Sequence, residues 1–252
     1  GYGMIHCAVL GDIETGYKYG TFALRLMDKL GIKKNNLKAL WVFWCMVNHW
    51  KNPIRDSLNH YLEAYQTGLE TGDLEFAAIH VNTYSCYMFY AGMDLDTVEK
   101  ETSMYTDAIS KLNQDTIHNF QLILHQAVLN LQGKSEDPCV LTGTSYDQDT
   151  MLPVHTEAKD ESALIAVYYF LVHLNFLFEN YAQANNYAKL AKKYIEAGIS
   201  TPYVPLIHFY DSLVRLSLYP GQNIFTRKKD MLIVSRNLGK MKKWAHHCPS
   251  NY

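Results

Sequence analysis

The chain of 252 residues has little net charge, −2 from 23 basic and 25 acidic residues. Such a balance supplies no long-range field that would attract nucleic acid or an anionic membrane, so neither partner is expected. The most basic stretch, Arg227–Lys229 followed by Lys240, Lys242 and Lys243, is interpreted as the solvated face of a helix rather than a phosphate-binding patch.

Long apolar runs and a disulfide framework are also missing. The longest apolar stretch, Ala163–Leu177, is interrupted by His173 and Asn175 and is too short to span a bilayer. A secretion leader is not seen, and the five cysteines are odd in number and widely scattered, which favours a reducing compartment. The sequence therefore predicts a soluble, cytoplasmic segment.

Motifs of common enzyme classes are missing as well. The sequence contains no HRD, DFG or GxGxxG string of a kinase or nucleotide-binding enzyme, and no Gly-x-Ser-x-Gly elbow of a serine hydrolase. Gly133-Lys134-Ser135 resembles the end of a phosphate-binding loop, but the first glycine of that motif would fall at Val128, within an expected helix. We expect a helix end at this point, and no catalytic residue in the chain.

Potential metal ligands are too few at any one place. Cys45 and His49 lie four residues apart on one expected helix, and His246, His247 and Cys248 cluster farther along. Packing of each cysteine as a small hydrophobic side chain is the better interpretation. One polar loop carries acidic residues without the glycine and closing glutamate that an EF-hand needs: Asp147, Asp149, Glu157 and Asp160. Neither a metal nor another cofactor is expected.

The chain does contain a regular spacing of helix-breaking residues. The gaps between them are 41, 40, 41, 47 and 40 residues, for the series Gly11, Asn52, Gly92, Gly133, Asn180 and Pro220. A second series falls between these breaks, at Gly31, Gly72, Asn113 and Gly198. Each period thus holds two elements, which is typical of a solenoid of helix pairs, a class that usually binds other proteins.

Apolar residues recur at three-to-four-residue spacing between the breaks, and no strand-like alternation occurs. We therefore predict an all-α fold, a right-handed solenoid of about six antiparallel helix pairs that forms one domain over residues 1–252. The expected helices are a short one to Leu10, then Ile13–Leu30, Leu37–Trp50, Ile54–Thr71, Leu74–Tyr90, Leu95–Leu112, Asp115–Leu131, Glu161–Glu179, Tyr181–Ala197, Pro205–Leu218 and Phe225–His246. Residues 133–157 are predicted to be an irregular insertion, because they include Pro138, Gly143 and Pro153, and the second helix of this pair is expected to be short or irregular.

The helix-pair pattern resembles tetratricopeptide repeats, through residues such as Ala184, Tyr187, Ala188 and Leu190, although the period is near 40 rather than 34 residues. Several strings are more specific, and they resemble the helical region of large multi-sensor hybrid kinases of the cyanobacterial type. These strings are NHWKNPIRDSL (Asn48–Leu58), EAYQTGLETGDLEFAA (Glu63–Ala78), QAVLNLQGKSEDPC (Gln126–Cys139), MLPVH (Met151–His155), HFYDSL (His208–Leu213) and MKKWAHH (Met241–His247).

The resemblance implies a domain order of a serine/threonine-kinase-like domain, an NTPase of the AAA/STAND type, this helical region, a GAF sensor and often a histidine kinase. It implies a regulatory role for the helical region but assigns no functional residue to it, because the family's catalytic motifs belong to the other domains. The start at Gly1 and the structured pattern of Met241–Tyr252 favour a segment excised from such a protein.

A file of polar residues on the first helices of the pairs is the remaining candidate for a binding surface. Such helices usually line the concave side of a solenoid. The candidate residues are Asn48, His49, Asn82, Ser85, His118, Gln121, His125, Tyr169, His173, His208, Asp211 and Arg215. They either form a groove for a peptide or linker, or satisfy one another's hydrogen bonds between helix layers.

Three functions follow from these observations. The first is a non-catalytic scaffold that binds domains of its parent protein, such as the NTPase, GAF or kinase domain. The second is a sensor that binds a peptide or small effector in the polar groove. The third, an enzyme, has the least support because catalytic motifs are missing.

Overall fold

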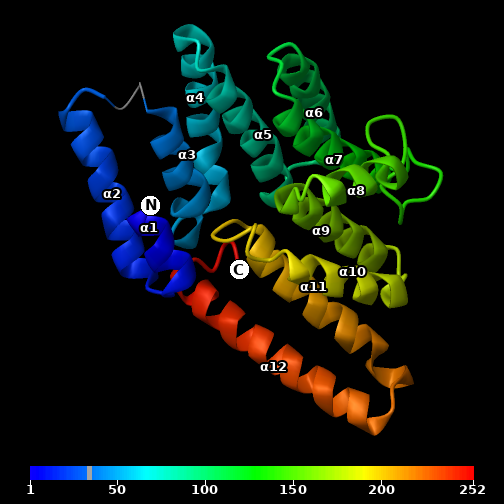
Figure 1. Ribbon diagram of the computed structural model, residues 1–252. Helices are drawn as coiled ribbons and strands as arrows, with labels where there is room; N and C mark the ends of the chain where they lie inside the picture. The colour runs from blue at the N-terminus through cyan, green and yellow to red at the C-terminus, as the bar shows by residue number, and fades with distance from the viewer. Residues whose placement is uncertain (33–35) are drawn as a thin grey trace. The chain divides into compact units, whose positions relative to one another are not determined.

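The computed structural model describes residues 1–32 and 36–252, and among them it forms helices and no strand (Figure 1). The predicted all-α class is confirmed. The described α-helices are α1 (Tyr2–Met4), α2 (Ile13–Lys29), α3 (Leu37–Met46), α4 (Leu58–Thr71), α5 (Leu74–Tyr90), α6 (Leu95–Ser110), α7 (Asp115–Leu131), α8 (Gln148–Glu157), α9 (Glu161–Leu177), α10 (Tyr181–Lys193), α11 (Tyr203–Leu218) and α12 (Ile224–His247). Short π or 3₁₀ segments are η1 (Ile5–Val9), η2 (Asn48–Trp50), η3 (Ile54–Ser57) and η4 (Tyr219–Gly221).

Most helices begin at a residue whose side chain accepts a hydrogen bond from an amide in the first turn. Asp12, Asp73, Asp94 and Asp160 each accept from the amide three residues ahead, at 2.9–3.3 Å, and so satisfy one of the amides that the helix leaves unpaired. Asn36 does the same for α3. These caps explain why the helix starts are visible in the sequence.

Helix ends coincide with many of the breaks noted in the sequence. Five glycines have left-handed backbone angles there, between φ 65° and 79°: Gly11, Gly31, Gly72, Gly92 and Gly133. Asn113 and Glu179 also have positive φ, at 56° and 62°. A left-handed residue closes a helix because it turns the chain while pairing the last carbonyl groups. The spacing of the breaks therefore reflects the spacing of helix ends.

The chain divides into two compact units. Unit 1 contains Gly1–Gln121 and His247–Asn251, and unit 2 contains Leu122–His246 and Tyr252. The single repeat domain expected for 1–252 stays a prediction. None of the described helices is both long and apolar enough to cross a membrane.

The centre of unit 1 is an aromatic cluster that joins α3, α4 and α5. The rings of Tyr61 and Tyr87 meet edge to face with centroids 5.1 Å apart, and both are fully buried. The Tyr87 hydroxyl donates to the carbonyl of Cys45 at 2.9 Å, so the buried phenol has a partner. This bond ties the end of α3 directly to α5.

The centre of unit 2 is α9, most of whose residues are buried. Helix α10 lies against it with small side chains, since Ala184, Ala188 and Ala191 are all buried. Helix α11 packs on both α9 and α10.

The predicted irregular insertion, residues 133–157, is only partly irregular. Its first part, to Asp147, is a loop fixed by α7: Gln126 Oε1 accepts from the amide of Ser145 at 3.0 Å, and Asn130 Nδ2 donates to the carbonyl of Val140 at 2.6 Å. Its second part is α8, with Pro153 inside the helix. Residues 148–157 thus form a short helix of ten residues despite the proline.

The last residues of the chain bind back to unit 1 through Asn251. Its Nδ2 donates to the carbonyls of His49 at 2.7 Å and Asn52 at 2.8 Å, and its Oδ1 accepts from the amide of Ile54 at 3.0 Å. We call these three bonds the Asn251 clasp. Repeats of a solenoid contact only their neighbours; the clasp instead joins residues about 200 positions apart, with a separation of 202 between His49 and Asn251.

Candidate functional site

The predicted polar file lies mostly inside the fold. Nine of its twelve residues are buried, and the other three, Asn82, His118 and His173, are partly buried. Buried polar groups need hydrogen-bond partners, and the file supplies them largely from its own members and nearby helices. Because these residues are buried, the structure favours the interpretation that they hydrogen-bond to one another between helix layers over the interpretation that they line an open peptide groove.

In unit 1 the file forms two groups of bonds. Gln121 of α7 accepts from Asn82 of α5 at 2.8 Å and donates to Ser85 at 3.0 Å. Asn48 donates to Ser57 at 3.1 Å, while the ring of His49 lies against that of Trp50 with centroids 4.5 Å apart. These bonds join α5 to α7 and the end of α3 to the start of α4.

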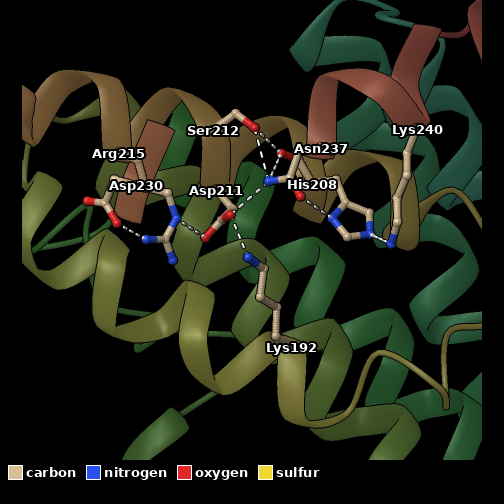
Figure 2. Close-up of polar contacts among 8 residues, drawn as sticks. All are labelled: Lys192, His208, Asp211, Ser212, Arg215, Asp230, Asn237 and Lys240. Atoms are coloured by element: carbon tan, nitrogen blue, oxygen red, sulfur yellow. Dashed lines mark hydrogen bonds and ion pairs between the residues drawn. The ribbon is translucent and has the colours of Figure 1, made fainter. Parts of the chain in front are cut away.

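In unit 2 the other members lie in three separate places. His125 bonds through Nδ1 to the hydroxyl of Ser145 at 2.9 Å, and Tyr169 contacts His173 within α9 at 3.3 Å. The third place is a larger cluster around Asp211, which we call the polar network: Lys192, His208, Asp211, Ser212, Arg215, Asp230, Asn237 and Lys240 (Figure 2).

Asp211 of α11 is the centre of the polar network, and its side chain is buried (Figure 2). It accepts from Lys192 of α10 at 2.5 Å, from Arg215 Nε at 3.1 Å and from Asn237 of α12 at 2.9 Å. Arg215 also pairs with Asp230 of α12. Two buried carboxylates therefore meet cations from two helices, and the set joins α10, α11 and α12.

The protonation of His208 follows from its neighbours. The amide nitrogen of Asn237 donates to Asp211 and to Ser212 Oγ and lies 3.3 Å from the carbonyl oxygen of His208, so the other amide atom, Oδ1, is an acceptor. His208 Nδ1 lies 3.0 Å from this Oδ1 and must donate to it. Lys240 then donates to Nε2 at 3.2 Å. The ring is thus held in its neutral Nδ1–H form.

The pKa values agree with this arrangement. Burial, together with the charges of Lys240 and Lys192, lowers the pKa of His208 from 6.5 to about 4. Burial alone would raise the pKa of Asp211, but hydrogen bonds from Arg215 and Lys192 outweigh it, and the pKa lies below its usual value. Burial lowers the pKa of Lys192, although the bond to Asp211 opposes this shift.

We expect the stability of unit 2 to fall with pH between about 6.5 and 4, in part through His208. The folded pKa is lower than the unfolded one, so the unfolded chain binds the proton first, and acid favours unfolding across this window. The partly buried His173, whose pKa burial also lowers to about 4, acts in the same direction in this window. Asp211, whose pKa lies below its usual value, adds the same effect at still lower pH.

A His208→Gln variant removes one of these groups. When the pH falls from about 6.5 to 4, the free energy of unfolding of the wild type should decrease by roughly 2 kcal/mol more than that of the variant. Urea unfolding at a series of pH values measures this difference. Parallel pH profiles for the two proteins would contradict the neutral His208.

The polar network holds α12 by one side and leaves its other side exposed. The inward residues Asp230, Val234 and Asn237 follow helical spacing and are buried. The opposite surface, which we call the outward face of α12, carries exposed apolar residues and cations. Its members are Ile224, Phe225, Met231, Leu232 and Leu238 with Lys228, Lys229, Arg236, Lys242 and Lys243. Phe225 is 83% exposed and Leu232 is 70% exposed.

Charge is strongly unequal between α12 and the rest of the chain. The helix has seven Lys or Arg residues and a single acidic one, the buried Asp230, which gives a net charge of +6. The chain has 23 basic and 25 acidic residues in total. Outside α12 there remain 16 basic and 24 acidic residues, which gives the rest of the chain a net charge of −8. The near-neutral net charge of the whole chain therefore conceals one strongly basic helix. From the sequence alone, its cations are interpreted only as a solvated surface.

The potential metal ligands noted in the sequence do not gather into one site in the described residues. In residues 1–32 and 36–252, no three His, Cys, Asp or Glu side chains form a group that could hold a metal ion. Burial raises the pKa of Cys45 to about 12, so its thiol stays protonated, which suits a packed side chain better than a ligand. Each charge of the polar network is used within the fold.

Comparisons with protein-family models, with curated proteins and with solved structures found no match to this chain. The candidate site is therefore argued from geometry and charge alone.

Proposed function

We propose that this chain is a non-catalytic interaction module of a multidomain signalling ATPase or kinase. The observation that carries the proposal is the outward face of α12, where apolar side chains stand exposed among cations without an exposed acidic residue on the helix. A contiguous exposed apolar patch on a folded protein marks an interaction site more often than a chance surface. The resemblance to multi-sensor kinases, and a TPR-like right-handed solenoid with a period near 40 residues, belong to the same proposal.

The composition of the outward face favours an acidic protein segment as the partner. Phe225 and Leu232 are seven residues apart, two helical turns, so they form one apolar row that a second helix can cover. The cations beside this row, such as Lys228 and Lys229, attract carboxylates and repel another basic segment. In the parent protein, an acidic helix of the NTPase, GAF or kinase domain would fit.

The polar network supports this role because it fixes the angle of α12. A face that is held rigid before binding loses less entropy when the partner docks. The alternative of an effector groove along the polar file has less support, because its residues are mainly buried and bonded to one another.

A binding experiment tests the proposal with the recombinant flanking domains of the parent protein as probes. Replacing Phe225 and Leu232 together by serine should weaken binding about 30-fold, which corresponds to the loss of roughly 2 kcal/mol of apolar burial. Replacing Lys228 and Lys229 by glutamate should mainly slow association and reduce its dependence on salt. Biolayer interferometry measures both effects.

Leu177→Ser is the matched control, since Leu177 is an exposed apolar residue of unit 2 on α9 rather than α12. It should leave binding unchanged. The proposal fails if no flanking domain binds the wild type, or if the control and the α12 variants bind equally well.

A further inference from the structure

An apolar row is exposed on the C-terminal two thirds of α2 in unit 1 and on Leu30, which follows the helix. Its members lie at helical spacing of i, i+3, i+7 and i+11: Tyr19, Phe22, Leu26 and Leu30. Phe22 is 63% exposed and Leu30 is 61% exposed. Such spacing places four large side chains in one stripe, which is the pattern of a helix face that packs on another helix.

Three residues of the stripe, Tyr19, Phe22 and Leu26, form one wall of a groove. The groove has a volume of about 480 Å³ and lies between α2 and α3, with α1 at one end. Residues from both helices line it, including Tyr19, Phe22 and Leu26 from α2 and Ala39, Val42 and Phe43 from α3. Its lining is mainly apolar, which is typical of a groove that receives hydrophobic side chains.

The floor of the groove is fixed by Gly20. A Cβ atom at this position would lie 2.8 Å from the Phe43 ring, so only glycine allows this ring to lie directly on the α2 backbone. At the α1 end, Tyr19 is held by ring contacts with Tyr2 and His6, with centroids 6.1 and 5.3 Å apart. The groove is therefore built from packed parts of unit 1.

The dimensions suit a short helix. The stripe from Tyr19 to Leu30 covers eleven steps of about 1.5 Å, or roughly 16 Å, which equals about three helical turns. No exposed strand edge exists in residues 1–32 or 36–252 to which an extended peptide could add. A helix that lays its apolar face into the groove is the mode of recognition that remains.

The charges beside the stripe select the kind of helix. Lys18, Arg25 and Lys29 follow the stripe on one side at spacing i, i+7 and i+11, next to Phe22. Lys38 of α3 lines the opposite wall. A docked helix would therefore have cations on both sides, and carboxylates on its flanks would complement them.

A second copy of this chain fits the groove poorly. In a two-fold contact through α2, the same surface of both copies would meet, which brings the Lys18, Arg25 and Lys29 rows near each other. The outward face of α12 carries cations as well, so it would be repelled too.

From the stripe, the groove and the cations, we propose that the α2–α3 groove binds one amphipathic helix of a partner protein. This helix would present apolar residues at i, i+3 or i+4, and i+7, with glutamate or aspartate along its flanks. The inference does not depend on the α12 surface, which lies in the other unit. It gives the chain a second docking surface and so the means to link two partners.

The experiment uses three labelled peptides of three to four helical turns with the folded 252-residue chain, read by fluorescence anisotropy. The first peptide has leucines at the stated spacing and glutamates on the flanks, the second has lysines in place of the glutamates, and the third is a scrambled form of the first. The glutamate peptide should bind at least tenfold more tightly than either of the others.

Two variants locate the site. Phe22→Ser combined with Leu26→Ser should weaken binding of the glutamate peptide about tenfold or more. Arg25→Glu combined with Lys29→Glu should also weaken it about tenfold, and should improve binding of the lysine peptide. All four positions are exposed, so circular dichroism should show unchanged folding.

The control for this site is the α12 double variant Phe225→Ser with Leu232→Ser, which should bind the glutamate peptide like the wild type. This control separates failure here from failure of the proposed function. If the glutamate peptide does not bind at millimolar concentration, or binds the wild type and the α2 variants equally, the proposal is wrong.

Discussion

Replacing Asp211 by alanine is expected to lower the free energy of unfolding of unit 2 by about 3–5 kcal/mol. The carboxylate is buried and accepts from Lys192, Arg215 and Asn237 at once. Its removal leaves Arg215 with only Asp230 as a carboxylate partner and leaves Lys192, whose pKa burial already lowers, without a counter-ion. Such an unpaired buried charge costs more than the lost pair itself contributes.

Amide hydrogen exchange is the measurement that assigns this loss to a unit. Exchange should become faster in α10, α11 and α12 and stay unchanged in α4 and α5 of unit 1. Asp211→Asn keeps the shape and the acceptor oxygen but removes the charge, so its cost should be smaller, about 1–2 kcal/mol. A loss below about 1 kcal/mol for the alanine variant would mean that the network is no stronger than a surface ion pair.

Replacing Gly16 by alanine is expected to lower the stability of unit 1 by about 3 kcal/mol, the upper end of the usual cost of overpacking. A Cβ atom there would lie 2.3 Å from Cys7 Sγ, 2.6 Å from the carbonyl oxygen of Gly3 and 2.9 Å from the amide nitrogen of Cys7. Two of these three atoms are backbone, so a side-chain rotation cannot relieve the contact. Either η1 or α2 has to move.

Gly239→Ala is the matched control because it is also a helical glycine, but no atom lies within 4 Å of its added Cβ. It should be neutral or stabilising by up to about 1 kcal/mol, since alanine is the better helix former. Thermal unfolding of the three proteins compares the two substitutions. Equal transition temperatures for Gly16→Ala and wild type would show that α1 and η1 are not packed closely on α2.

Helix positions could be predicted from the sequence because their signals are local. An aspartate that caps a first turn, as at Asp73, and a left-handed glycine that closes a last turn, as at Gly72, act within a few residues. The loop and helix of 133–157 were harder, because α8 tolerates Pro153 and the loop is fixed by Gln126 and Asn130 of another helix.

The polar file shows that residue spacing alone does not determine whether a helix face is exposed or buried. Helical spacing placed His208, Asp211 and Arg215 on one face correctly, but whether that face meets solvent or another helix depends on α12. Sequence reasoning missed Lys192, Asp230 and Asn237, which come from other helices. One signal for Asp230 was present: it is the single acidic residue in a helix with seven Lys or Arg residues.

The two proposed docking surfaces were not predicted from the sequence for a related reason. The seven-residue spacing of Phe225 and Leu232, and the spacing of Tyr19 to Leu30, are visible in the sequence. Either pattern also describes a helix face buried in a core, as for most of α9. Only the exposed fractions separate the two cases.

The Asn251 clasp constrains the order in which unit 1 can fold during synthesis. A ribosome delivers the chain from the N-terminal end at about 5–20 residues per second, so His49 and Asn52 emerge roughly ten seconds or more before their partner. During that time the two carbonyls lack the amide donor of Asn251. Unit 1 therefore completes the three bonds of the clasp only after unit 2 has been synthesised, and a chain truncated within α12 would lack the residue that closes its first-made unit.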